Sequence, residues 1–385
     1  MRAWIRVFCL ICGLWAGTAA AVEVQILWLE RRVPPPPVLS NLDPVPDDLG
    51  LQGAALGVAD SNTTGKFLKQ SYTLSEVYLE EGAKIEPGVL AGADLVVAKL
   101  PVADLLAIAD MAEAQGALIF NTGSADISLR REACRANLFH TLPSRAMLAD
   151  ALAQFLVKKK WDELFLVAGP AEGDQAYADA IRDAARKFRL EIVEDKPWPF
   201  ATDLRRSAGQ EVPVFTQVDD HDVLIVTDEA GDFARYIPFN TWEPRPIAGS
   251  EGLVPTAWSR AVEQWGAAQL QSRFVKQTGR PMQALDYAAW AAVRSIAEAV
   301  TRTKAADAAS VRAYLLSDKF QLAAFKGRKM SFRDWNGQLR QPIPLVTERA
   351  LVANAPLEGF LHQHSELDTL GYDRSVAGCE AFDRD

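Results

Sequence analysis

The chain has 385 residues, of which 49% are hydrophobic and 24% are charged, and its formal net charge is −9. This length is too great for one ordinary hydrophobic core and predicts two domains, while the apolar content is typical of a packed globular protein. An acidic chain without a basic tract is unsuited to binding nucleic acid or an anionic membrane surface.

The first 21 residues have the pattern of a secretory signal peptide. Arg2 and Arg6 precede a short apolar run, and small residues follow it up to Ala21. The run is shorter than the ~20 residues that span a bilayer. We therefore expect cleavage near Ala21 and a soluble, periplasmic mature protein that begins at Val22. An uncleaved membrane anchor is one alternative for this segment, and a lipoprotein is another, which the position of Cys9 and Cys12 inside the apolar run disfavours.

The mature chain opens with a buried-strand pattern, residues 24–29, followed by a proline-rich excursion. Residues 31–46 include four consecutive prolines, which favour an extended surface segment over a helix. This segment is either a long first loop or a lip over a ligand cleft.

Strand and helix patterns then alternate, which predicts βαβ units and largely parallel sheets. The expected strands are residues 74–79, 95–98, 118–120, 164–167, 191–193 and 223–226. The expected helices are residues 47–62, with Asp47 or Asp48 as N-cap, residues 102–115, residues 144–159, capped by Ser144, and residues 174–188, opened by Asp174. Helices dominate residues 259–316, and strand-like segments 329–332, 342–346 and 350–352 follow.

Two cysteines remain after signal cleavage, Cys134 and Cys379. In an oxidising compartment such a pair predicts a disulfide, which would join the C-terminal tail to the first half of the chain. Two free, buried thiols are the alternative.

Polar turns follow the carboxyl ends of several expected strands, where ligands bind in open α/β sheets. They are residues 99–102, 121–126 and 169–177, with Asp228 and Glu229 after a further strand. The sequence has no phosphate-binding glycine motif and no nucleophile elbow.

The remaining chemistry-bearing residues form no catalytic or metal-binding pattern. His362 and His364 lack the further ligands of a closed zinc site. Residues 219–222 are oxygen-rich but lack the spacing and the glycine of a calcium loop. We interpret both as solvated surface features, and we expect no catalytic residue, no metal and no cofactor.

Nearly the whole mature chain resembles the type I periplasmic binding proteins of the branched-chain amino acid (Leu/Ile/Val-binding) class. The segments that carry the resemblance are residues 59–65, 96–114, 121–124, 174–177, 249–252, 287–300 and 327–344. The resemblance implies an α/β fold of two Rossmann-like lobes with central, mostly parallel sheets, joined by three crossovers. It places lobe one at residues 22–143 and 252–328, and lobe two with the C-terminal tail at residues 144–251 and 329–385.

The resemblance also implies a ligand site in the cleft between the lobes. The residues expected there are Lys99, Pro101, Asn121, Gly123, Ser124, Asp126, Tyr177 and Glu251, and Asp228 joins them because it follows a strand. Three of these have a plainer alternative: Lys99 as a solvated loop residue, Tyr177 as lobe packing and Glu251 as a surface turn.

The first ligand-binding turn departs from the family pattern. Amino-acid-binding members have small hydroxyl residues there, which hold the α-carboxylate together with backbone N–H groups. This chain has Lys99-Leu100-Pro101-Val102 instead, and Pro101 has no N–H to donate. Lys99 could supply a full charge in place of dipoles, and the altered turn disfavours an amino-acid ligand.

A narrower set of motifs resembles the substrate-binding proteins associated with PQQ-dependent alcohol catabolism. They are residues 29–31 with the proline run, residues 40–43, 62–65 and 370–373. Together the resemblances imply a monomeric substrate-binding protein of an ABC transporter. It would capture a small organic solute for an inner-membrane permease and work beside a PQQ-dependent dehydrogenase system.

Two other functions compete with solute capture for a permease. One is a periplasmic ligand sensor or accessory protein of a quinoprotein dehydrogenase. The other is an enzyme on the same fold, which the missing nucleophile and base disfavour, although fold alone does not exclude it.

Overall fold

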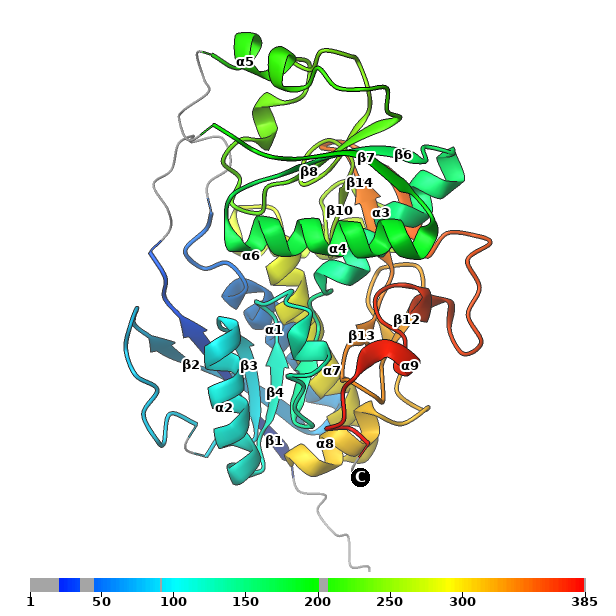
Figure 1. Cartoon of the computed structure of the whole chain (residues 1–385). Coiled ribbons are helices and arrows are strands. Elements are labelled where there is room, and N and C mark those ends of the chain that lie inside the picture. The colour runs from blue at the N-terminus through cyan, green and yellow to red at the C-terminus, as the bar shows by residue number, and fades with distance from the viewer. Residues whose placement is uncertain (1–20, 35–44, 91, 201–206, 384–385) are drawn as a thin grey trace, which may run out of the picture.

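The computed structural model describes residues 21–34, 45–90, 92–200 and 207–383. The expected signal peptide, apart from Ala21, and the middle of the proline-rich excursion lie outside the described residues. Two lobes are stacked on one another, each with its own sheet (Figure 1). The α/β fold with two mostly parallel sheets is confirmed.

The first lobe is built on a five-stranded parallel sheet in the order β2-β1-β3-β4-β5. Its strands are β1 (Val22–Arg31), β2 (Gln70–Leu79), β3 (Leu95–Lys99), β4 (Leu118–Asn121) and β5 (Leu138–His140). Ile26 and Trp28 pack into one hydrophobic cluster, and Leu27 and Leu29 pack into another on the opposite face. Both faces are covered, which is why the strands read as continuous apolar runs.

Helices cover both faces of this sheet. Residues of α1 (Leu51–Leu68) and α7 (Ala284–Thr303) share the cluster that contains Trp28, and residues of α2 (Val102–Gln115) share the cluster that contains Leu29. The expected bounds of α2 are confirmed. The other helices of this lobe are α6 (Ala267–Thr278) and α8 (Ala308–Leu315).

The expected N-cap of α1 is wrong. The helix begins after Gly50, whose φ of 93° suits glycine and whose N–H donates to the Asp286 carboxylate at 2.8 Å. Asp48 instead pairs with Arg280 at 2.9 Å. The helix also continues to Leu68, beyond the expected end at residue 62.

Two glycines let α1 approach α7 closely. A Cβ atom on Gly53 would lie 1.8 Å from the backbone oxygen of Asp286, and one on Gly57 would lie 2.8 Å from Val293 Cβ. Only glycine fits at either position unless the two helices separate.

We expect Gly53→Ala to lower the free energy of unfolding by about 1–3 kcal/mol, because the methyl group overpacks a helix contact. Gly209→Ala is the matched control, since this helical glycine has only a side-chain atom 3.8 Å from the added Cβ. The control should stay within about 0.5 kcal/mol of wild type or gain stability. Equal loss in both variants, measured by denaturant unfolding, would contradict the close approach.

The second lobe has a four-stranded parallel sheet in the order β7-β6-β8-β9. Its strands are β6 (Glu163–Ala168), β7 (Glu191–Pro197), β8 (Val223–Thr227) and β9 (Ile247–Gly249), and its helices are α3 (Arg145–Lys159), α4 (Glu172–Phe188) and α5 (Ala208–Phe215). The predicted cap of α3 is confirmed, because the Ser144 side chain accepts from Met147 N.

Short antiparallel strands form two further small sheets. They are β10 (Val254–Pro255), β14 (Ile343–Val346) and β15 (Leu351–Ala355) in one sheet, and β11 (Leu322–Ala323), β12 (Lys329–Phe332) and β13 (Leu339–Arg340) in another. The chain passes between the lobes after β5, after β10 and after β13.

The packing of β12 and β13 bears on the lobe boundaries. Phe332 and Leu339 belong to the hydrophobic cluster of the first lobe, and Gln338 bridges to His140 of β5. We therefore propose that the third crossover lies at residues 341–342 instead of at 328–329. The other expected boundaries remain proposals.

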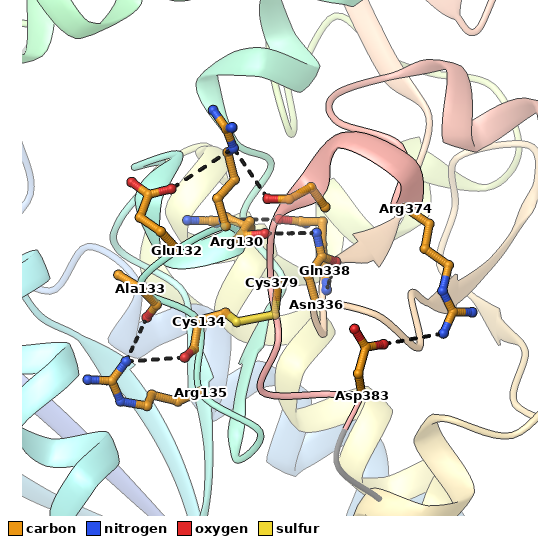
Figure 2. Close-up of a disulfide and its surroundings, with 12 residues drawn as sticks. Arg130, Glu132, Ala133, Cys134, Arg135, Asn336, Gln338, Arg374, Cys379 and Asp383 are labelled. Atoms are coloured by element: carbon orange, nitrogen blue, oxygen red, sulfur yellow. Dashed lines mark hydrogen bonds and ion pairs between the residues drawn. A yellow bond between two sulfur atoms is a disulfide. The ribbon is translucent and has the colours of Figure 1, made fainter.

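The C-terminal tail leaves the second lobe and returns to the first. Leu370 packs in the core of the second lobe. Further along, beyond α9 (Arg374–Ala377), Cys379 forms a disulfide with Cys134, with the two Cα atoms 5.8 Å apart (Figure 2). The predicted pairing is confirmed. The segment from residue 370 to residue 383, which we call the strap, therefore connects the second lobe to the first.

Candidate functional site

The strand orders create a crevice in each lobe. Strand order reverses between β1 and β3 in the first lobe and between β6 and β8 in the second. Ligands of open α/β sheets bind beyond the carboxyl ends of the strands at such a switch point. A cleft of about 1820 Å³ lies there, lined by Glu30 and Lys99 from the first lobe and by Glu172 and Glu229 from the second.

Of the nine expected site residues, five line this cleft. They are Lys99, Pro101, Gly123, Ser124 and Asp126. Val33, Pro34, Val45 and Pro46, which flank the undescribed part of the proline-rich excursion, line it too. The reading of that excursion as a lip is supported at its two ends.

Lys99 is engaged within the first lobe. Its Nζ donates to Glu30 Oε1 at 2.8 Å and to the backbone oxygen of Leu49 at 3.0 Å. The other oxygen of Glu30 accepts from the buried indole of Trp28 at 3.0 Å. Glu30 is 6% exposed, so the Lys99 charge compensates a buried carboxylate.

Asn121 and Arg130 stabilise the turn at residues 121–126, which we call the second turn, from the side away from the cleft. The buried Asn121 side chain accepts from Gly123 N at 3.2 Å and Ser124 N at 2.9 Å. Arg130 donates to the backbone oxygens of Ser124 and Asp126 at 2.9 and 2.7 Å. Burial lowers the pKa of the Arg130 guanidinium to about 9. Asn121 therefore shapes the turn from beneath the cleft surface.

The sequence analysis missed Arg145, which lies between the lobes. It pairs with Glu229 through two hydrogen bonds of 2.9 and 2.7 Å, and its guanidinium is 3.8 Å from Asp126. Despite desolvation, hydrogen bonding and the charges of Glu229, Asp126 and Glu172 raise the pKa of Arg145. Asp126 belongs to the first lobe and Glu229 to the second, so this network spans the cleft.

Four expected site residues lie outside the cleft lining: Asn121, beneath the turn, and three others. Tyr177 is buried in the core of the second lobe. The Asp228 carboxylate accepts from the backbone N–H groups of residues 232, 233 and 234. Glu251 accepts from its neighbour, Gly252 N, at 3.2 Å. Tyr177 therefore serves lobe packing and Glu251 belongs to a turn, as their alternative interpretations had it. Asp228 stabilises its own turn.

His140 lies under the second turn, fully buried, with Nδ1 3.1 Å from the Asn121 side-chain nitrogen. Burial and the nearby charge of Arg130 hold the pKa of His140 well below its usual range. The His140 imidazole is therefore neutral in the folded protein and takes up a proton on unfolding. The free energy of unfolding consequently falls as the pH drops below the unfolded-state pKa of His140, about 6.5.

We expect the fold to lose about 1.4 kcal/mol for each pH unit below 6.5 on account of His140. Denaturant unfolding at pH 7.5 and pH 5.5 measures this slope. His140→Gln should flatten it, and His364→Gln, which changes an exposed histidine, should not. An unchanged slope in His140→Gln would contradict the assignment.

A second cavity, of about 1160 Å³, lies between the tail and β12 and is lined by His362 and His364. His362 Nε2 is 3.4 Å from Asp373 Oδ1. Over the described ranges, no three His, Cys, Asp or Glu side chains are grouped to hold a metal ion. No helix in that part of the chain is long and apolar enough to cross a membrane.

Comparisons with known proteins agree with this architecture. Residues 89–210 match the family model described as periplasmic binding protein. No curated protein sequence matches the chain.

Solved structures share the fold at low sequence identity. A periplasmic binding protein from Burkholderia mallei is 16% identical, with a TM-score of 0.66 over 94% of this chain and 99% of that chain. A branched chain amino acid ABC transporter periplasmic ligand-binding protein from Burkholderia xenovorans is 17% identical, with a TM-score of 0.66 over 86% and 95%. A leucine-, isoleucine-, valine-, threonine- and alanine-binding protein from Brucella ovis, in its closed conformation, is 14% identical, with a TM-score of 0.63 over 87% and 93%.

These matches agree with the expectation of a binding protein instead of an enzyme. The resemblance seen in the sequence is thereby confirmed: the chain has the type I periplasmic binding protein fold, and its residues 89–210 match the periplasmic binding protein family.

Proposed function

We propose that the chain is the substrate-binding protein of an ABC importer and captures a small organic solute between its lobes in the periplasm. The observation that carries the proposal is the cleft of about 1820 Å³ at the switch points of both sheets. Three chain crossovers form the hinge, about which the lobes close on the solute. Gly123, Ser124 and Asp126 contact the solute from the first lobe.

The partners follow from this role. The closed form docks on an inner-membrane permease as a monomer. We further propose that the solute is one that PQQ-dependent alcohol oxidation produces or requires, which the motifs at residues 29–31 and 370–373 support by resemblance. Permease and ATPase genes beside a quinoprotein dehydrogenase gene are the expected neighbourhood. A neighbourhood with the dehydrogenase but without the permease would favour the sensor role instead.

Thermal shift of the mature chain tests solute capture. The panel holds short alcohols, aldehydes, carboxylates, amines and amino acids, with PQQ and Ca²⁺. A ligand at a hundred times its Kd stabilises the fold by about 2.7 kcal/mol.

Ser124→Trp, which fills the cleft, should abolish the shift. Ser272→Trp, which changes an exposed serine of α6, should keep it. A shift that survives Ser124→Trp would contradict binding in this cleft, and silence across the panel would contradict the capture of these solute classes.

A further inference from the structure

The lining of the cleft has an excess of negative charge. Among the described residues, eight carboxylate side chains and four cationic side chains line it. Charges in a cleft with low-dielectric walls act strongly on a bound ion. The excess therefore favours a cationic solute and disfavours an anionic one.

The cations of the lining already have carboxylate partners. Lys99 pairs with Glu30 at 2.8 Å, and Arg145 pairs with Glu229 through two hydrogen bonds. Arg31 pairs with Asp104, and Arg32 lies 3.9 Å from Glu80. An incoming carboxylate would have to displace one of these partners, and removal of Lys99 from Glu30 would leave a buried, unpaired charge.

Backbone groups that could hold a carboxylate are also occupied or absent. In the turn at residues 99–102, Pro101 has no N–H to donate. In the second turn, Gly123 N and Ser124 N both donate to the Asn121 side chain. In the second lobe, Glu229 N donates to the Asp174 carboxylate at 2.6 Å. Three turns at the strand ends thus offer few donors to an anion.

Two of the helices whose first turns contribute to the cleft lining, α2 and α4, carry acidic residues in those turns. Asp104 lies in the first turn of α2, and Glu172 and Asp174 lie in the first turn of α4. These carboxylates offset the partial positive charge with which a helix N-terminus attracts anions. The same cleft also has apolar lining from Leu100, Leu142, Leu148 and Leu285.

Given the proposed function, we infer that the captured solute is a small protonated amine with an apolar body and no carboxylate. The ammonium group lies near Asp126 and Glu172, and the apolar body packs against the leucines. An α-amino acid binds more weakly, because in the described lining its carboxylate finds no unpaired cation and few free N–H groups at the strand-end turns. Alcohols, aldehydes and carboxylates, the substrates and products of alcohol oxidation, are thereby excluded as cargo, so the solute would be an amine that the oxidation system requires.

Isothermal titration calorimetry on the mature chain tests the solute class with matched probes. Ethylamine, butylamine and 3-methylbutylamine are each compared with the alcohol and the carboxylate of the same chain length, and with alanine, norvaline and leucine, which add only the carboxylate. In at least one series the amine should bind ten times or more tighter than the other three members, and higher salt should weaken it.

Tighter binding of a carboxylate, an amino acid or an alcohol would overturn the inference but leave solute capture standing. If no compound of any series binds and no compound of the wider panel gives a thermal shift, both the amine inference and the proposal of solute capture are overturned. A ligand from the wider panel counts for the inference if it is an amine without a carboxylate and against it otherwise.

A charge-deletion variant locates the ammonium group. Glu172→Gln should weaken the amine about threefold to tenfold, as expected for a nearby partly solvated charge. Glu191→Gln removes an exposed carboxylate from β7, outside the cleft lining, and should leave the affinity unchanged. Equal effects of the two variants would overturn the placement.

Discussion

Replacement of Asp368 by alanine should lower the free energy of unfolding by about 3–5 kcal/mol, the usual cost of breaking a buried ion pair from one side. The Asp368 and Arg333 side chains are 0% and 2% exposed, and Arg333 Nε is 2.9 Å from Asp368 Oδ1. Arg340 Nε donates to both oxygens of Asp368 at 2.9 Å. Without the carboxylate, Arg333 would be a buried cation with only backbone oxygens as acceptors.

Asp334→Ala is the matched control for this prediction. Asp334 pairs with Arg374 at 3.0 Å, but both side chains are about half exposed, at 49% and 58%. An exposed pair contributes about 0–1 kcal/mol. Urea unfolding of the two variants measures the difference, and a loss below about 1 kcal/mol in Asp368→Ala would show that Arg333 finds other compensation.

Removal of the disulfide by Cys134→Ala with Cys379→Ala should cost up to roughly 5 kcal/mol on the chain-entropy account. The bridge closes a loop with a sequence separation of 245, and both cysteines are buried at 6% exposure. The tail beyond Tyr372 should detach first, because without the bridge it is held to the first lobe mainly by weaker contacts such as that of Phe382 with Phe139.

Denaturant unfolding of the oxidised protein, the reduced protein and the double variant tests this. The reduced protein and the double variant should agree with each other and fall below the oxidised protein. Hydrogen exchange should then be faster in residues 373–383. A double variant within about 1 kcal/mol of the oxidised protein would contradict a stabilising role for the strap.

The sequence predicted most of the fold because hydrophobic periodicity and capping are local signals. The bounds of α2 and the Ser144 cap of α3 are confirmed. The short strands β5 and β9, of three residues each, were missed because they are too short to show a period. The N-cap of α1 was wrong because a contact with Asp286, distant in sequence, decides where that helix begins.

The candidate site was predicted less completely. Strand ends located the turns with Lys99 and Ser124, but which side chains reach the cleft depends on tertiary packing. Two local signals in the sequence could have pointed to cleft residues that were missed. Glu30 lies in an apolar strand and needs a buried partner, and Arg145 lies in the first turn of a helix, where the helix dipole disfavours a cation.

Small-angle X-ray scattering of the mature protein, with and without the tightest-binding amine, tests the central claim that the lobes close on a solute in this cleft. The account predicts that saturating amine lowers the radius of gyration and that Ser124→Trp abolishes this change. An unchanged radius of gyration in the presence of an amine that calorimetry shows to be bound would contradict capture by lobe closure.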